Sequence, residues 1–132
     1  MTVKFIEKIT QDAFGLWISA LFSSISSWNP DLSFTQQKDA FFTIVEHLLN
    51  HGKIKFIAPD ADCYVSPDNP HPKLTINDSE AHWNLEAEQI IDYLKSKWPD
   101  EVTSANDEEL TYYFYEIPGV IWVDNDGKFI AS

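Results

Sequence analysis

The sequence predicts a small α+β domain, with about three helices packed on a short antiparallel sheet and a β-hairpin at the C-terminal end. Two observations predict this class. Three stretches carry apolar residues at the three- and four-residue spacing of a helix face. Shorter apolar runs between Gly, Pro and Asp residues are typical of strands joined by turns. The length of 132 residues suits one domain over residues 1–132.

The first predicted helix carries a regular apolar stripe before a proline. Its stripe consists of Phe14, Trp17, Ile18, Leu21, Ile25 and Trp28. We therefore expect both of its tryptophans to pack in the core. Asn29-Pro30 ends the helix, because a proline disfavours helical geometry in the residue before it.

Ser33 and Gln36 fit the capping box of a second helix, which runs to a stop signal at His51-Gly52. Residues 53–57 then alternate at first between polar and apolar, as in a half-buried strand. Residues 59–78 hold four Pro and form a long loop, with extended pieces expected at 64–65 and 74–76.

Asn84 is the predicted cap of a third helix that carries Leu94 and Trp98 and ends at Pro99. Residues 110–117 are rich in aromatics and fit either a short helix or a strand. The last segments, 120–123 and 128–131, flank Asp-Asn-Asp-Gly and predict a β-hairpin.

The chain is strongly acidic, and the excess lies in its second part. It has 21 Asp and Glu against nine Lys and no Arg, which gives a net charge of −12. Residues 1–58 are balanced, whereas residues 59–132 carry sixteen acids and four Lys. This charge disfavours nucleic acid and acidic membrane surfaces, and it favours a basic protein partner. A solvated surface that aids solubility is the competing interpretation.

Cys63 is the single cysteine, so no intramolecular disulfide can form. The first ten residues do not resemble a signal peptide, and the most apolar stretch is too short to span a bilayer. We therefore expect a cytoplasmic location.

Several residue groups could hold a metal or act in catalysis, but each has a simpler explanation. His47 and His51 share a helix face, yet the Glu of a metalloprotease signature is missing. Asp124–Gly127 lacks the remaining ligands of a calcium loop and suits a turn. Asp60 and Asp62 are more often solvated than bound to a cation. Cys63 has His71 and His82 nearby in sequence, which does not establish a nucleophile and base.

We expect no enzyme activity, no metal and no cofactor, and instead a binding surface. Tyr112, Tyr113 and Tyr115 cannot all face one side of a helix or strand, so at least one should be exposed among acids. A buried aromatic segment beside a solvated acidic connection fits equally well. The predicted partner-binding residues are Asp60, Asp62, Asp68, Asp100, Glu101, Asp107, Glu108, Glu109, Tyr112 and Tyr113.

Four groups of residues carry a resemblance to known proteins: Gly52-Lys53-Ile54-Lys55-Phe56, Ile91-Asp92-Tyr93-Leu94 with Lys97-Trp98-Pro99, Tyr113-Phe114-Tyr115-Glu116-Ile117-Pro118, and Trp122 with Asp126-Gly127-Lys128. On these motifs, residues 14–132 resemble a small bacterial family of domains of unknown function, and they are similar to immunity proteins of contact-dependent and other polymorphic toxin systems. They are mostly packing and turn residues.

The resemblance implies a cytosolic protein that blocks a toxin's effector domain, such as a nuclease that is basic where it binds its substrate. Two alternatives stay open. One is a housekeeping interaction or regulatory domain, which could form a homodimer. The other is a metal-dependent hydrolase built on His47, His51 and loop acids.

Overall fold

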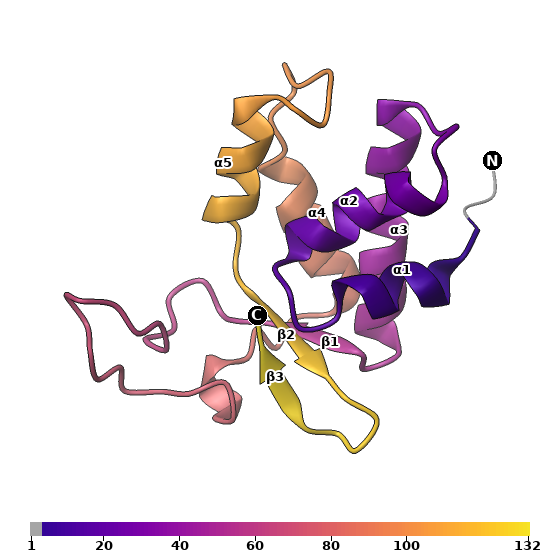
Figure 1. Ribbon diagram of the computed structural model, residues 1–132. Coiled ribbons are helices and arrows are strands. Elements are labelled where there is room, and N and C mark those ends of the chain that lie inside the picture. Colours follow the sequence, from indigo (N-terminus) through magenta and orange to yellow (C-terminus); the bar gives the residue numbers. More distant parts are fainter. Residues whose placement is uncertain (1–3) are drawn as a thin grey trace.

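The computed structural model describes residues 4–132 and consists of five α-helices and a three-stranded antiparallel sheet (Figure 1). This arrangement confirms the predicted α+β class. The elements are α1 (Ile6–Ala13), α2 (Ile18–Trp28), α3 (Phe34–Asn50), β1 (Ile54–Phe56), the 3₁₀ turn η1 (Ser79–Ala81), α4 (Ala87–Ser96), α5 (Glu108–Glu116), β2 (Val120–Val123) and β3 (Phe129–Ala131).

The sheet has the order β1-β2-β3, and one of its faces packs against the helices. Ile54, Trp122 and Ile130 lie in register across the strands and pack against the helical core. β2 and β3 form the predicted hairpin. In its turn the Asp124 carboxylate accepts hydrogen bonds from the backbone N–H groups of Asp126 and Lys128, at 2.9 and 2.8 Å, and Gly127 adopts φ +78°. The turn chemistry predicted at this site is confirmed.

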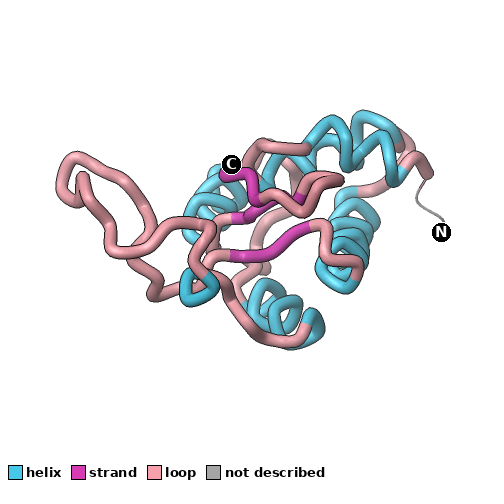
Figure 2. Tube along the Cα trace, turned by 90° about the horizontal axis from the view of Figure 1, so that it is seen from below, coloured by secondary structure: helices cyan, strands magenta, loops and turns pink. Residues whose placement is uncertain are grey.

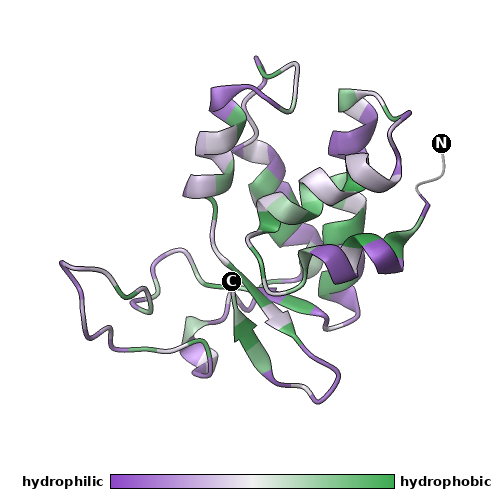
Figure 3. Ribbon diagram, in the orientation of Figure 1, coloured by the Kyte–Doolittle hydropathy of each residue, from purple (hydrophilic) through white to green (hydrophobic). Residues whose placement is uncertain are grey.

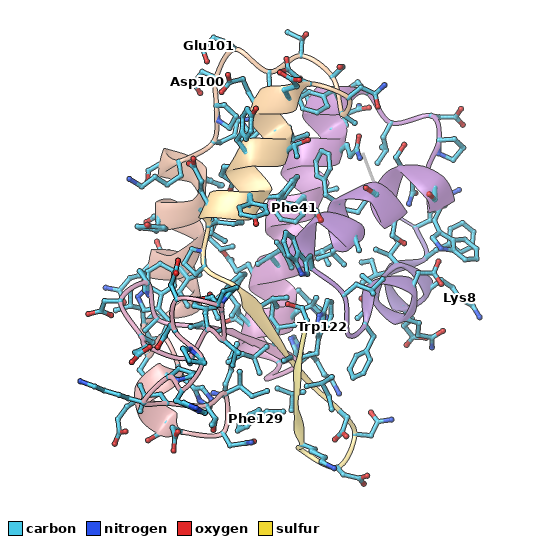
Figure 4. The ribbon with its side chains drawn as sticks, turned by 60° about the vertical axis from the view of Figure 1, so that its left-hand side comes forward. Lys8, Phe41, Asp100, Glu101, Trp122 and Phe129 are labelled. Atoms are coloured by element: carbon cyan, nitrogen blue, oxygen red, sulfur yellow. The ribbon has the colours of Figure 1, made fainter. Side chains whose placement is uncertain are left out.

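α3 is the central helix and packs against α2, α4 and β1. Its capping box forms as predicted, because Ser33 accepts from the Gln36 N–H and Gln36 accepts from the Ser33 N–H. Phe41 of α3 is fully buried (Figure 4). It belongs to a buried aromatic cluster, in which rings from α2, α3 and α5 and the ring of Trp98, just after α4, meet edge to face or tilted. The cluster comprises Phe22, Phe34, Phe41, Phe42, Trp98, Tyr113 and Phe114.

The N-terminal prediction was wrong in two respects. Residues 6–13 form a helix that was not predicted, and the next helix begins at Ile18 rather than near Phe14. Gly15, with φ +81°, reverses the chain between them. Phe14 and Trp17 therefore lie outside the helix stripe, and Trp17 is 51% exposed rather than buried.

The structure also corrects the predicted cap of α4 and decides between the two alternatives for the α5 segment. Asn84 does not cap α4; the N-cap is Glu86, whose N–H donates to the Gln89 side chain at 3.1 Å. The sequence leaves residues 110–117 open between a helix and a strand, and the structure places 108–116 in helix α5, where the Asp107 carboxylate caps the first turn by accepting from the Glu109 N–H at 3.0 Å. The extended pieces expected at 64–65 and 74–76 do not form strands.

The long loop between β1 and η1 projects from the body of the molecule (Figures 1 and 2). Asp62 holds it together, because its carboxylate accepts from the Asn69 amide at 2.7 Å and from the Lys73 N–H at 3.1 Å. The hydrogen bond from Asn69, and then that from Lys73, lower the pKa of Asp62. At the end of the loop, the His82 ring packs on Phe129 of β3 with centroids 4.7 Å apart.

Among residues 4–132, no helix is both long and apolar enough to cross a membrane. Figure 3 shows the hydrophobic residues concentrated along α2, α3 and the strands, whereas α5 and the hairpin turn are more hydrophilic. α5, which carries Glu108, Glu109 and Glu116, lies at the edge of the group of helices (Figure 1).

Candidate functional site

The two faces of α5 differ sharply in exposure. Leu110 and Tyr113 point into the core, whereas Glu108, Tyr112 and Tyr115 follow each other at four- and three-residue spacing on the outer face. Tyr112 is 56% exposed and Tyr115 is 73% exposed. Two rings and several carboxylates therefore share the solvent face of one short helix.

Tyr113, one of the predicted partner-binding residues, does not belong to this surface. Its side chain is buried against Trp98, and its hydroxyl donates to the Leu94 carbonyl oxygen at 2.7 Å. Burial raises the pKa of Tyr113 well above its usual range. A ring that is fixed inside the core cannot contact a partner, so this assignment was wrong.

A groove of about 640 Å³ lies where the end of α5, the start of α2 and the long loop meet. Its volume is within the range of about 300–1,000 Å³ that is usual for ligand sites. We call it the aromatic groove, because ring atoms form much of its wall. The residues that line it are Trp17, Ile18, Pro59, Tyr64, Val65, Tyr93, Phe114, Tyr115, Glu116, Ile117, Pro118, Gly119, Val120 and Ser132.

Tyr64 connects the long loop to the sheet and forms one side of the aromatic groove. Its hydroxyl oxygen accepts a hydrogen bond from the Gly119 N–H at 3.1 Å. A Cβ atom at position 119 would lie 3.0 Å from that oxygen and 3.3 Å from Ile57 Cδ1, so the close approach favours glycine. Burial also raises the pKa of Tyr64 above its ordinary value.

Trp17 reaches the groove because the loop between α1 and α2 is fastened to the sheet. Trp122, at the centre of the sheet in Figure 4, donates from Nε1 to the Leu16 carbonyl oxygen at 2.7 Å, and Phe14 packs on its ring. Trp17 then meets Tyr115 edge to face, with ring centroids 5.4 Å apart. On the other side of this pair lies a smaller hollow of about 210 Å³ between α2 and α5.

The predicted acids do not gather at one place. Asp100 and Glu101 lie together at one end of the molecule (Figure 4), in the connection that enters the first turn of α5. The long loop that carries Asp60 and Asp68 projects near the other end of α5 (Figure 1). Along this side of the molecule the aromatic groove lies between the two groups.

The individual acids differ in what they can offer to a partner. Glu108 and Glu109 are exposed in the first turn of α5, and Asp107 caps that helix. Asp62 already uses both carboxylate oxygens within the loop. Glu116, which was not among the predicted site residues, is the one charged side chain of the described residues that lines the groove.

The residues considered for metal or nucleophile chemistry are engaged locally. The His47 and His51 rings stack with centroids 4.1 Å apart, and His51 Nδ1 lies 2.8 Å from the His47 carbonyl oxygen. His82 Nε2 lies 2.6 Å from the Ile76 carbonyl oxygen. Burial, with a further contribution from the charge of Asp62, raises the pKa of Cys63 and so disfavours the thiolate.

Over residues 4–132, no cluster of three or more His, Cys, Asp or Glu side chains is arranged to hold a metal ion.

Sequence reasoning missed Trp17, Tyr64 and Glu116 as groove residues. Gly15 was a usable signal for Trp17, because a glycine three residues before Ile18 can separate two helices and expose what lies between them. Tyr64 gave no comparable signal, since its contact with Gly119 joins residues 55 positions apart. No family model, no curated protein and no solved structure matches this chain.

Proposed function

We propose that this protein is a non-enzymatic, cytoplasmic binding protein that neutralises a basic toxin domain by direct protein–protein contact. The observation that supports the proposal best is the outer face of α5, where the exposed rings of Tyr112 and Tyr115 stand among carboxylates. Aromatic anchors surrounded by charge of one sign are typical of interfaces that bind by ring burial and attract by charge.

The division of charge also supports this proposal. Residues 59–132 carry the whole net charge of −12, and they include α5, the acidic connection and the long loop. A basic effector would associate with this acidic side faster than with a neutral surface, and added salt would lower the association rate. A nuclease is one effector class with a basic substrate surface that such a protein could cover.

Co-expression tests the proposed function directly. The product of the gene immediately upstream is expressed in a bacterial host with and without this protein, and growth is followed. We expect growth arrest by the neighbour alone and restored growth with both. A neighbour that is not toxic, or whose toxicity this protein leaves unchanged, would contradict the proposal and favour a housekeeping role.

The acids at the start of α5 provide a second, kinetic test with the purified pair. Replacing Asp107, Glu108 and Glu109 by Lys should slow association and flatten its dependence on salt. The control reverses Glu7 in α1 and Asp126 in the hairpin turn, two exposed acids on elements that lie away from α5 in Figure 1. An association rate at low salt that is unchanged by the first variant would remove these acids from the interface.

A further inference from the structure

The aromatic groove combines free ring surface with a carboxylate. Trp17 and Tyr64 are each 51% exposed, and Tyr115 is 73% exposed, so all three keep ring area for another molecule. Within residues 4–132, Glu116 is the one residue with a charged side chain along its wall. Exposed apolar surface of this kind, next to a hollow, typically marks a binding site.

Several other aromatic rings of the molecule already have a lysine over one face. The ammonium groups of Lys38, Lys95 and Lys97 lie 5.3, 5.8 and 5.5 Å from the ring centroids of Trp98, Phe42 and Tyr93, respectively. Each distance is within the ~6 Å at which a cation is attracted to an aromatic face.

Among the groove rings, Tyr93 is therefore already engaged, by Lys97 and by the edge of Trp83. Within residues 4–132, no lysine makes such a contact with Trp17, Tyr64 or Tyr115. These three rings thus remain open to a cation that another molecule brings.

We propose that the aromatic groove binds a segment of the partner protein by taking up an arginine or lysine side chain, which lies against Trp17, Tyr64 and Tyr115 and pairs with Glu116. This inference rests on the proposed function, which supplies a basic partner, and it names the part of that partner that is bound. Ring faces and a carboxylate both attract a cation, so the two contributions act on one side chain.

A second copy of this chain is a poorer occupant of the groove. Two molecules of charge −12 repel each other, and two of the four lysines of the acidic part, Lys95 and Lys97, already contact rings of their own chain. An acidic peptide is disfavoured by Glu116 for the same electrostatic reason. Charge complementarity therefore points to a basic segment.

Selection from a random library of displayed 12-residue peptides, panned on the purified full-length protein, tests this inference without the toxin. Enriched peptides are synthesised, and their affinity is measured for the wild type and for Trp17→Ala, Tyr115→Ala and Glu116→Gln. Phe5→Ala is the control, because Phe5 is an exposed aromatic residue at the start of α1 that neither lines the groove nor belongs to the outer face of α5. Circular dichroism checks that each variant is folded, and Glu116→Gln keeps the test informative if an aromatic variant unfolds.

We expect the enriched peptides to share an Arg or Lys. Trp17→Ala and Tyr115→Ala should each weaken binding by at least about 10-fold, as for anchor residues of interfaces, and Phe5→Ala should change it by less than about 2-fold. Replacing the shared Arg or Lys by norleucine should cost at least as much as Glu116→Gln.

Three outcomes would overturn the inference: no enrichment, enriched peptides without a cation, or basic peptides that all four variants bind equally. Each is distinguishable from a failure of the proposed function. If the protein protects against the toxin while the groove variants bind like the wild type, the function stands and the groove assignment is wrong. If the groove variants lose peptide binding but the protein does not protect against the toxin, the groove assignment stands and the proposed function is wrong.

Discussion

The buried aromatic cluster and the aromatic groove contain the same kinds of side chain in opposite surroundings. In the cluster, rings from α2, α3 and α5 contact one another and Trp98, and Lys38 and Lys95 cover its outer edge. In the groove, Trp17, Tyr64 and Tyr115 are exposed, and the carboxylate of Glu116 lines the wall beside them. Cations thus accompany the rings that hold the fold together, whereas an anion accompanies the rings that are left open.

This difference separates stability from binding within one short helix. Tyr113 and Tyr115 lie two residues apart on α5, which places one ring in the cluster and the other in the groove. Ring surface that is buried within the chain contributes to folding. Exposed ring surface contributes to folding only through the few contacts it makes, so it stays available to a partner.

The largest expected effect comes from Trp98, which touches Phe22, Phe34, Phe42, Tyr113 and Phe114. Trp98→Ala removes a buried ring from the centre of these contacts and should lower the free energy of unfolding by about 3–5 kcal/mol. Urea denaturation followed by circular dichroism measures the loss. Trp17→Ala is the matched control at an exposed tryptophan, and equal losses for the two variants would contradict the division into a core cluster and an open groove.

A smaller effect is expected from the tyrosine hydroxyls of α5. Tyr113→Phe leaves the ring in place but removes the buried hydrogen bond to the Leu94 carbonyl, so the free energy of unfolding should fall by about 1–2 kcal/mol. Tyr115→Phe should change it by less than about 0.5 kcal/mol, as for other surface positions. Similar values for both, from the same denaturation measurements, would show that the Tyr113 hydroxyl contributes nothing to stability.

The helices of the core could be predicted from sequence because their signals are local. The stripe of α3, its Ser33–Gln36 capping box and the stop at Gly52 all lie within about twenty residues, and each formed as expected. The Asp124–Gly127 turn is equally local. The α5 segment stayed ambiguous, because its aromatics suit both strand and helix, and its cap at Asp107 was not recognised.

The groove could not be predicted in the same way, because contacts between distant segments build it. Trp17 appeared to continue an apolar stripe, and only the link between Trp122 and Leu16, 106 positions apart, shows how it is turned outward. Tyr64 is placed by its bond to Gly119. The acidic excess could be located along the chain, but its two groups are separated in space by the groove.

The contact between Trp17 and Tyr115 should contribute modestly to stability and strongly to binding. Tyr115→Ala removes an edge-to-face pair at a largely exposed site, for which a loss of about 0.5–1.5 kcal/mol in unfolding free energy is expected. A double-mutant cycle with Trp17→Ala isolates the part that belongs to the pair. A coupling energy of zero would show that the two rings act independently, and their alignment would then have to come from a bound partner.

The smallest effect on global stability, and the most local one, concerns the loop wall of the groove. Hydrogen bonds from Asn69 and Lys73 hold the pKa of Asp62 below its ordinary range, so the loop contacts are fully present above about pH 4 and are lost as pH falls through that lowered pKa. NMR titration should show the Lys73 amide and the Asn69 side-chain amide shifting with a midpoint below the ordinary Asp value. Asp62→Asn should abolish this titration and speed hydrogen exchange in residues 62–74 while leaving the denaturation midpoint nearly unchanged. Asp68→Asn is the control, because Asp68 is exposed in the same loop. If both variants loosen the loop equally, its order depends on net charge rather than on the Asp62 carboxylate, and Tyr64 would have to be held in the groove by Gly119 alone.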